Sequence, residues 1–378
     1  MHNFKKLKIW NESMKLVSES YKLTRSFPKF ETYGLMSQMN RCAVSIPSNI
    51  SEGTSKSSDK HFAAYLEHSL GSAFEWETQL NVAFNENYIY PLEENHRFPM
   101  IKYELIPEQL IRENTCTSDN FFKPNKIDKN IVLLTHEIEY FKRFTSLNLS
   151  KKEIREIGFP LSKELVEREM EIAQGTIKGI HYSIKNGISM NIAGGTHHAF
   201  YNRGEAFCML NDQAIGANYL LNEQLAKKIM IIDLDVHQGN GTASLFSSNP
   251  NVFTLSFHGK KNYPFRKEIS DLDIEFNDNA KDDEYLNKLK ETIPRVLNEF
   301  QPDFIFYLSG VDVLENDKLG RLSLSIEGCK KRDKYILEMC HKNSIPVQVS
   351  MGGGYSLILK NIIEAHSNTF RLAQEIYF

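Results

Sequence analysis

The clearest pattern in the chain is an alternation of short apolar runs with longer stretches of helical spacing, from about residue 82 to the end. Runs of four or five apolar residues are typical of strands that are buried on both faces of a parallel sheet. Residues 137–186 have mostly helical spacing. The alternation therefore predicts a doubly wound α/β domain with a parallel sheet over residues 82–378. Strands are expected at 82–84, 131–134, 188–192, 229–232, 252–255, 304–308 and 345–349.

The first 80 residues have a different pattern, in which apolar positions recur three and four residues apart. One face of a first helix carries Leu7, Trp10, Met14, Val17 and Tyr21. A second helix is expected from about residue 33, kinked or broken by the proline at position 47, and a third from the serine or aspartate at 58–59. These stripes are typical of packing faces, so residues 1–80 are predicted to be a small all-α helical-bundle segment without chemistry.

Charge and composition exclude some classes of function. The formal net charge of −3 gives no electrostatic reason to expect a nucleic-acid partner. No apolar run approaches a membrane span, and no signal sequence is evident. The odd set of scattered cysteines indicates reduced thiols in a reducing compartment, so we expect a cytoplasmic protein. The cysteines are Cys42, Cys116, Cys208, Cys329 and Cys340.

A polar cluster directly follows the apolar run at 229–232. Asp233, Asp235 and His237 occupy positions i, i+2 and i+4, so in extended backbone their side chains point to one side. Oxygen and nitrogen ligands without a thiolate suit zinc in a catalytic site, although iron(II) remains open. The plainer alternative is that acidic residues simply end a strand.

Four other expected strands also end in polar groups. These are residues 194–198 (GGTHH), 256–258 (SFH), 309–312 (SGVD) and 352–355 (GGGY). In a parallel sheet the carboxyl ends of the strands meet at one edge, so we expect a single site there.

The residue types predict a metal-assisted hydrolysis of an amide. Three residues can be protein ligands that leave the metal an open position: Asp235, His237 and Asp312. The adjacent His197 and His198 can act as the acid and base, oriented by Asp233 and Asn240. Tyr355 could donate its hydroxyl group to the developing oxyanion.

At these residues the sequence resembles the zinc-dependent histone deacetylase family, which has the arginase-deacetylase fold. The resemblance covers about residues 82–378. The motif at 233–241 is most similar to that of the bacterial and smallest-class branch of the family. The matching motifs, in order, are GGTHHA (194–199), FCMLND (207–212), DLDVHQGNG (233–241), GVDVL (310–314) and GGGY (352–355).

The resemblance implies roles for these residues. It implies zinc on Asp235, His237 and Asp312, the two histidines as the acid/base pair, and the tyrosine as carbonyl polariser. It implies Phe207 and Gly353 as substrate-binding residues, and Arg97 near the acetate exit. It also implies a structural K⁺ or Na⁺ site formed by Asp233, Leu234, Asp235, His237, Ser256 and Phe257.

Two positions depart from the family pattern. Asn240 stands where many members have a second aspartate, so it brings no charge to support an imidazolium at His198. Residues 263–265 (YPF) replace the usual aromatic rim, which leaves the opposite wall of the substrate tunnel open.

The N-terminal segment resembles the four-helix-bundle proteins encoded within ribosomal RNA intervening sequences. The best matching pieces are residues 33–35, 41–49 and 51–53. The fourth helix should follow Leu80, but a different domain begins there. Three helices leave an open apolar groove, which the second domain or another subunit would cover, so a homo-oligomer is possible.

The sequence leaves three functions open. The leading one is a zinc hydrolase that removes acetyl or longer acyl groups from lysine or from a polyamine-like amine. An arginase-like ureohydrolase would need a second metal and more bridging carboxylates than the sequence offers. A catalytically idle fusion that binds acylated ligand and forms oligomers is the third.

Overall fold

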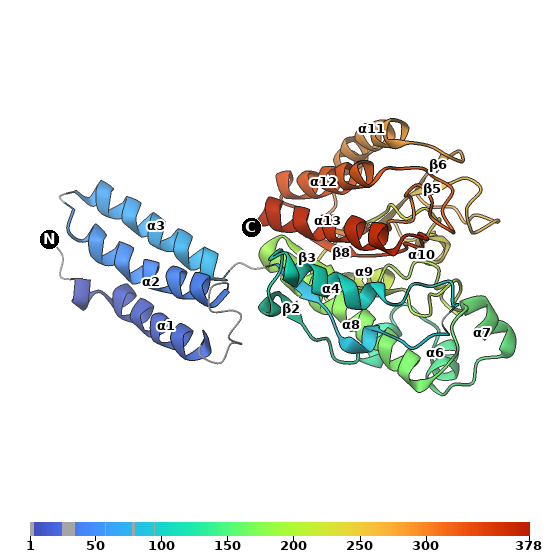
Figure 1. The fold of residues 1–378 in the computed structure, drawn as a ribbon, viewed down its shortest axis with the longest axis horizontal. Coiled ribbons are helices and arrows are strands. Elements are labelled where there is room, and N and C mark those ends of the chain that lie inside the picture. Colours follow the sequence, from blue (N-terminus) through green and yellow to red (C-terminus); the bar gives the residue numbers. More distant parts are fainter. Residues whose placement is uncertain (1–3, 25–34, 57, 78–79, 94) are drawn as a thin grey trace. The chain divides into compact units, whose positions relative to one another are not determined.

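The computed structural model describes residues 4–24, 35–56, 58–77, 80–93 and 95–378 (Figure 1). Contacts within the chain divide it into two compact units, residues 1–79 and residues 80–377. Within the described ranges, no helix is both long enough and apolar enough to cross a membrane.

The N-terminal unit consists of the 3-10 turn η1 (Phe4–Lys6) and the helices α1 (Lys8–Thr24), α2 (Leu35–Gly53) and α3 (Asp59–Glu77). The side chain of Ser58 begins α3 by accepting a hydrogen bond from the His61 backbone amide at 3.3 Å. The predicted break at Pro47 is not observed, because α2 continues to Gly53. Packing overrides the proline: Ile46 and its neighbours are buried, and Ser69 of α3 donates to the Ile46 carbonyl at 3.0 Å.

The first helix buries a different face from the expected one. Ser13 and Ser20 are buried, whereas Met14 and Tyr21 are 41% and 42% exposed. Each buried serine donates its hydroxyl group to a carbonyl of its own helix at 2.8 Å. Because the hydroxyl groups are hydrogen-bonded, burying these small polar residues costs little free energy. Part of the apolar stripe of α1 therefore remains accessible.

The second unit is built on one sheet of eight parallel strands. The order is β2-β1-β3-β8-β7-β4-β5-β6. Every residue of the four central strands β3, β8, β7 and β4 is buried, as expected for a sheet covered on both faces. The strands are β1 (Asn81–Ala83), β2 (Phe121–Phe122), β3 (Ile188–Asn191), β4 (Ile229–Asp233), β5 (Val252–Gly259), β6 (Leu272–Phe276), β7 (Phe304–Leu308) and β8 (Val347–Ser350).

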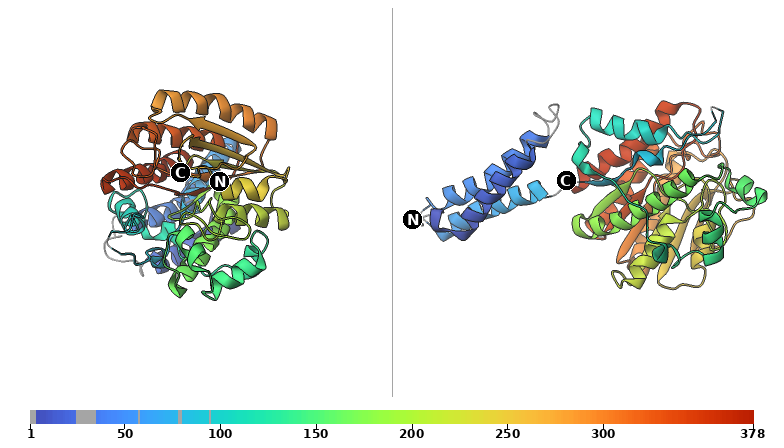
Figure 2. Two further views of the ribbon diagram at one scale, coloured as in Figure 1. Left: turned by 90° about the vertical axis from the view of Figure 1, so that its right-hand side faces the viewer. Right: turned by 90° about the horizontal axis from the view of Figure 1, so that it is seen from below.

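Helices cover both faces of this sheet (Figures 1 and 2). The long helix α8 packs on β1, β3 and β8 and against α9, while α11, α12 and α13 pack in series on the other side. The helices and 3-10 turns are η3 (Glu86–Tyr88), α4 (Lys102–Arg112), η4 (Ser118–Asn120), α5 (Lys129–Val132), α6 (Ile138–Thr145), α7 (Lys151–Ile157), α8 (Lys163–Asn186), α9 (Asp212–Asn222), α10 (Asn240–Phe246), α11 (Asp282–Phe300), α12 (Ile326–Lys342) and α13 (Leu359–Tyr377).

The parallel α/β architecture is the predicted one, but one strand prediction was wrong. Residues 129–132 form the short helix α5 rather than a strand. The Asp128 carboxylate accepts a hydrogen bond from the Asn130 backbone amide at 2.8 Å, which caps a helical turn. A four-residue apolar run cannot by itself distinguish a strand from a buried helical turn.

Strand β5 also differs from its prediction. It continues past Leu255 to Gly259, so Ser256, Phe257 and His258 lie inside the strand instead of beyond its end. His258 is fully buried, with its Nδ1 atom 3.0 Å from the Ser256 hydroxyl oxygen. The strands β3, β4, β7 and β8 do end where the other polar motifs begin, and they place those motifs at one edge of the sheet.

A buried ion pair connects α12 to this edge. The Arg332 guanidinium donates to the Asp333 carboxylate at 2.8 Å and to the carbonyl oxygens of Leu234 and Gly310 at 3.0 and 2.7 Å. Tyr307 also donates to Asp333. Since the two carbonyls directly follow β4 and lie just beyond β7, the guanidinium holds the ends of these neighbouring strands together.

Candidate active site

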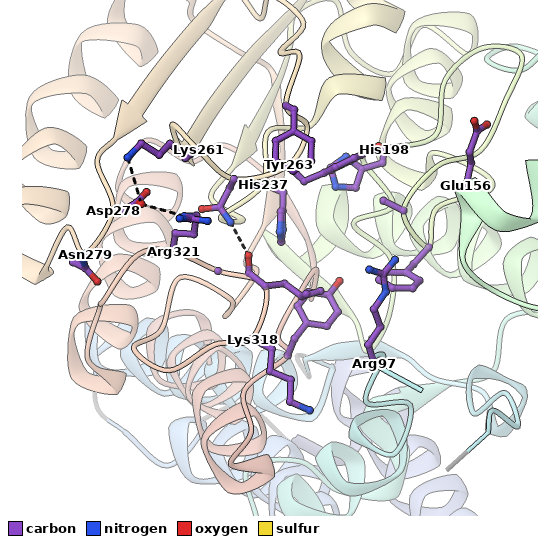
Figure 3. A pocket seen from close by; sticks show the side chains of 17 residues that line it. Arg97, Glu156, His198, His237, Lys261, Tyr263, Asp278, Asn279, Lys318 and Arg321 are labelled. Carbon is purple, nitrogen blue, oxygen red and sulfur yellow. Dashed lines mark hydrogen bonds and ion pairs between the residues drawn. The ribbon is translucent and has the colours of Figure 1, made fainter. Parts of the chain in front are cut away.

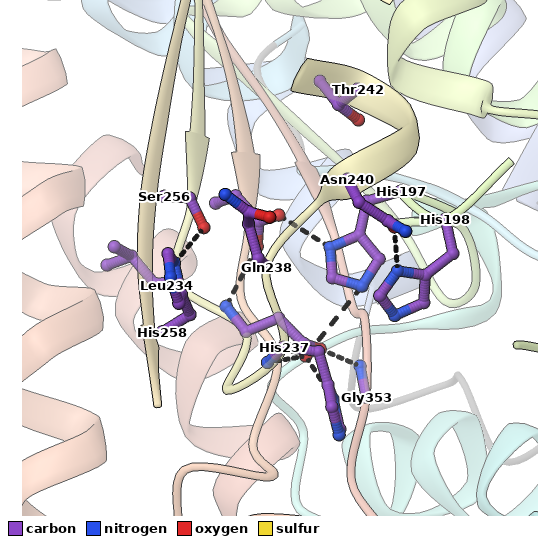
Figure 4. Close-up of polar contacts among 12 residues, drawn as sticks. His197, His198, Leu234, His237, Gln238, Asn240, Thr242, Ser256, His258 and Gly353 are labelled. Carbon is purple, nitrogen blue, oxygen red and sulfur yellow. Dashed lines mark hydrogen bonds and ion pairs between the residues drawn. The ribbon is translucent and has the colours of Figure 1, made fainter. Parts of the chain in front are cut away.

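The centre of the site is a cluster of two carboxylates and one imidazole at the ends of β4 and β7. One ligand atom from each of Asp235, His237 and Asp312 lies within 4.8 Å of the others, and all three residues are buried. The backbone holds the carboxylates in place. Asp235 accepts from the Gly353 amide at 2.8 Å (Figure 4). Asp312 accepts from the Val236 amide at 2.9 Å.

This donor set fits a divalent cation. Burial opposes charge on His237, yet the Asp235 and Asp312 carboxylates raise its pKa to about 10. Burial and the Asp235 charge raise the pKa of Asp312 to about 7. Both shifts show an excess of negative charge in a buried place, which a metal ion would neutralise. The three residues would hold it and leave further coordination positions open, as in catalytic zinc sites.

Gly353 lies against this cluster, and a larger residue does not fit. A Cβ atom at this position would lie 2.0 Å from Asp312 Oδ2 and 2.7 Å from Asp235 Oδ2. We expect Gly353→Ala to displace the carboxylates and to weaken any binding of a divalent metal by about 10- to 100-fold. Competition with a chromophoric chelator measures the affinity, and an unchanged affinity would contradict this prediction.

The two adjacent histidines lie beside the cluster, and each is held by a different partner (Figure 4). His197 Nδ1 donates to Asp233 Oδ2 at 2.6 Å, and His198 Nδ1 donates to Asn240 Oδ1 at 2.6 Å. These bonds leave Nε2 of each ring available for proton transfer. The two rings are 4.1 Å apart between centroids.

The partners give the two histidines opposite pKa shifts. Burial opposes charge on His197, but the charge of Asp233 and its hydrogen bond more than offset this effect and raise the pKa. Burial and the nearby His197 and His237 rings hold the pKa of His198 well below its usual value. Asn240 cannot reverse the second shift because its amide is uncharged.

Tyr355 lies next to the Asp235/His237/Asp312 cluster, with its ring centroid 6.3 Å from that of His237. Burial and the charges of Asp312 and Asp235 hold its pKa well above the usual value, so its hydroxyl group remains a hydrogen-bond donor. The Tyr355 backbone amide donates to Asp317 at 2.6 Å. Asp317 also accepts from the amides of Leu319 and Gly320, so it fixes the loop that carries the tyrosine.

A cavity of about 670 Å³ leads from the surface to this site (Figure 3). Phe207 and Tyr263 line it, and His198, His237 and Tyr355 lie at its base. The Tyr263 ring stands perpendicular to His198, at 4.9 Å, and therefore supplies the wall that the sequence left open. Ala206 and Phe207 both have positive φ, 43° and 69°, and the turn is fixed by their amides, which donate to Glu156 and Ile157.

Of the predicted monovalent-cation residues, Asp233 ends β4, Ser256 and Phe257 lie in β5, and Leu234, Asp235 and His237 follow β4. Asp233 pairs with Ser256 in the register of the two strands, and Phe257 follows in β5. The Leu234 carbonyl, however, already accepts a hydrogen bond from Arg332. The K⁺ or Na⁺ site stays a prediction.

Arg97 lines the cavity, with its guanidinium 4.8 Å above the Phe207 ring. Its place near an acetate exit stays a prediction. A smaller cavity of about 40 Å³, which both histidines also line, is lined by Arg168. Arg168 comes from α8 and forms an ion pair with Glu169 in the domain interior.

Sequence reasoning missed three residues that support the site. Lys102 is completely buried and donates to the Gly352 carbonyl at 3.0 Å; burial lowers its pKa to about 8, although the Asp312 and Asp235 charges oppose that effect. Glu205 accepts from the Tyr263 hydroxyl at 2.7 Å. Asp317 is the third. None of the three follows a strand end. The D-x-L-G motif at 317–320 does indicate a turn, and it could have drawn attention to Asp317.

Comparison with known proteins identifies the family of the larger unit. Residues 92–370 match the family model of the histone deacetylase domain. An uncharacterized protein of Picosynechococcus sp. is 36% identical over 78% of this chain and 99% of its own length. The chain belongs to the histone deacetylase family. The predicted resemblance is thereby confirmed.

More distant members of the histone deacetylase family are also similar. Histone deacetylase 2 of Arabidopsis thaliana is 26% identical over 74% of this chain and 75% of its own. The acetoin utilization protein AcuC of Staphylococcus aureus is 25% identical over 74% and 78%. The crystal structure of the HDA15 HD domain has a TM-score of 0.65 and 18% identity over 76% of this chain and 89% of that one, which confirms the fold.

The N-terminal resemblance is confirmed as well. Residues 5–102 match the family model of the 23S rRNA-intervening sequence protein. This match extends beyond α3 into β1 and the start of α4, which in this member of the histone deacetylase family belong to the larger unit. Strand β1, which lies within the residues matched by this model, is therefore part of the sheet of the larger unit.

The asparagine partner of His198 predicts a pH effect. In Asn240→Asp a carboxylate would face His198 Nδ1 and raise the pKa of His198 from its low value. The limb of the pH profile of kcat/KM that reports His198 should therefore move to higher pH. Asp233→Asn is the matched control, since it removes the charge that raises the pKa of His197 and should move the limb that reports His197 to lower pH. An unchanged profile in Asn240→Asp would show that Asn240 does not set the pKa.

Proposed function

We propose that this protein is a zinc-dependent deacylase that hydrolyses the amide of an acetylated or longer-acylated lysine or related amine. The family supports a deacetylase function in general terms. The observation that supports the finer proposal is that a buried Asp/His/Asp cluster lies beside two oriented histidines and a tyrosine, with His198, His237 and Tyr355 lining one cavity.

Asp235, His237 and Asp312 would hold the zinc, with iron(II) as the other candidate for this donor set. A bound metal of this kind polarises a carbonyl group and lowers the pKa of its water. The remaining groups act on protons and orientation. The Nε2 atoms of His197 and His198 would take the proton from the attacking water and give one to the leaving amine. Their Nδ1 partners, Asp233 and Asn240, hold each ring in the required tautomer.

Tyr355 and Phe207 would act on the substrate directly. The neutral Tyr355 hydroxyl would donate to the carbonyl oxygen as negative charge develops there. Phe207 and Tyr263, on the walls of the cavity, would hold the aliphatic stem of the acylated side chain between two rings.

The test is turnover of three substrates by metal-loaded protein of known metal content: an acetyl-lysine peptide, an acetylpolyamine and a long-acyl-lysine peptide. Turnover with one zinc per chain is expected. Two metals per chain, with turnover of a guanidino substrate, would instead support the arginase-like alternative. Bound metal without turnover of any of these substrates would contradict the deacylase proposal.

We further propose that the N-terminal unit joins copies of this chain. Met14 and Tyr21, seven residues apart on one face of α1, are 41% and 42% exposed, and an exposed apolar stripe on a helix favours self-association. Light scattering is expected to show an oligomer that Met14→Lys converts to monomer. A monomeric parent chain would contradict this part of the proposal.

We also propose a cytoplasmic location. Cys116, Cys208, Cys329 and Cys340 are buried free thiols, which a reducing compartment preserves.

A further inference from the structure

We propose that the opening of the active site selects an acyl-lysine that is flanked by acidic residues in a peptide, and that it disfavours cationic acylated polyamines. This inference rests on the proposed deacylase function and concerns its substrate class. It comes from the charges around the opening rather than from the groups at its base.

Cations from three separate segments line the opening. Arg97 precedes α4, Lys261 follows β5, and Lys318 and Arg321 lie in the loop between β7 and α12 (Figure 3). All four are exposed. Within the described part of the chain, neither Arg97 nor Lys318 takes part in an ion pair closer than 4.0 Å, so both are available to a ligand.

Among the residues that the structure describes, two carboxylates line the same opening, and each forms ion pairs with lysine or arginine. Asp278 lies 3.7 Å from Lys261 and 3.1 Å from Arg321 through its Oδ2 atom. Its Oδ1 atom is buried, so it cannot reach a ligand in the opening. Glu156 lies 3.7 Å from Lys152. In Figure 3 it stands across the opening from Asp278 and its two cations.

The resulting field is positive where a substrate enters. Four cations face two carboxylates, and clefts lined by one sign of charge concentrate ligands of the opposite sign. An acylated polyamine carries its remaining ammonium groups into this field and gains nothing from it. Aspartate or glutamate beside the acyl-lysine would face Lys318 and Arg97.

The rim also favours a peptide over a small amine. Phe265 lines the opening and is 93% exposed, which is unusual for so large an apolar side chain. A small acylated amine would fit entirely within the part of the cavity near Phe207 and would not reach the rim. A peptide would extend to the rim, where its backbone and side chains would contact the Phe265 ring.

The experiment compares acetyl-lysine peptides of one length whose flanking residues are acidic, neutral or basic, together with N-acetylputrescine and N8-acetylspermidine. We expect kcat/KM to be about tenfold or more higher for the acidic than for the basic peptide at low salt. The ratio should fall as ionic strength rises, because exposed charges are screened. An acetylpolyamine or basic peptide that is turned over as well as the acidic one would overturn the inference.

Two variants and one control assign the effect to the opening. Lys318→Glu should reduce the acidic-to-basic ratio by about fivefold. Phe265→Ala should raise KM for the peptides without changing it for the small acetylated amines. Lys290→Glu, on the exposed face of α11, changes the net charge equally and should leave the ratio unchanged. A ratio that changes equally in Lys318→Glu and Lys290→Glu would overturn the assignment.

Binding separates this inference from the proposed function. Fluorescence anisotropy with the labelled peptides and zinc-loaded protein gives the charge preference without turnover. If no peptide is hydrolysed but the acidic one binds more tightly in a salt-dependent way, the deacylase proposal fails and the charge selection stands. If all peptides bind equally, the charge selection fails whether or not they are hydrolysed.

Discussion

Tyr355→Phe is expected to lower kcat by about 10²- to 10³-fold, which is the usual cost of removing one donor to a developing oxyanion. The variant keeps the ring, whose contacts with Phe207 and Phe98 have centroid distances of 6.1 and 5.9 Å. It removes only the hydroxyl group, whose high pKa keeps it protonated at neutral pH. Turnover should therefore be lost while the cavity keeps its shape.

The measurement is steady-state hydrolysis of an acetyl-lysine peptide, together with binding of the same labelled peptide by anisotropy. Tyr201→Phe is the matched control, because that side chain is 55% exposed and does not line the cavity. Retained binding with lost turnover supports an enzyme. Equal turnover by Tyr355→Phe and the parent chain would contradict the role of this hydroxyl group, and absence of turnover by both would favour the idle ligand-binding fusion.

Arg332→Met is expected to reduce the free energy of unfolding of the larger unit by about 3–5 kcal/mol. The substitution leaves the buried Asp333 carboxylate without its guanidinium partner. It also leaves the Leu234 and Gly310 carbonyls without a donor. Since these carbonyls precede or lie near the proposed ligands Asp235 and Asp312, the affinity for a divalent metal should fall as well. Urea unfolding and chelator competition measure the two effects.

The double variant Arg332→Met/Asp333→Leu tests the physical reason. It removes both charges, so no uncompensated ion remains in the interior, and part of the lost stability should return. Tyr307 and Thr369, which donate to Asp333, would still lose their acceptor, so recovery is expected to be incomplete. A double variant that is less stable than Arg332→Met would contradict this explanation.

The sequence predicted the parts of the site that follow directly from strand ends. In a parallel sheet, residues that follow the carboxyl end of any strand lie at the same edge. Asp235, Asp312 and Tyr355 could therefore be predicted to lie together from three separate motifs. The Asp233 and Asn240 partners of the histidines lie at the distances expected for hydrogen bonds.

The parts that could not be predicted depend on loops and on packing. Asp317 accepts a hydrogen bond from the Tyr355 amide across a turn. Glu205 accepts one from the Tyr263 hydroxyl, in a loop more than 50 residues away. Neither residue belongs to a periodic hydrophobic pattern that would indicate its position. At the opening, sequence motifs gave no reason to group Lys318 with Arg97. The buried serines of α1 show the same limit, because the neighbouring helices decide which face of a helix is covered.

The position of β1 has a consequence for the order of events during synthesis. This strand begins at Asn81, soon after the last helix of the N-terminal unit, yet it pairs with β3, where its partner is Ser189. At about 5–20 residues per second, ribosomes need roughly 5–20 s to make the intervening chain. The helical unit is built from contacts within residues 1–79 and can be complete during that interval, whereas β1 can pair with β2 early but must wait for β3. The N-terminal unit can thus be a finished structure before the central part of the sheet assembles.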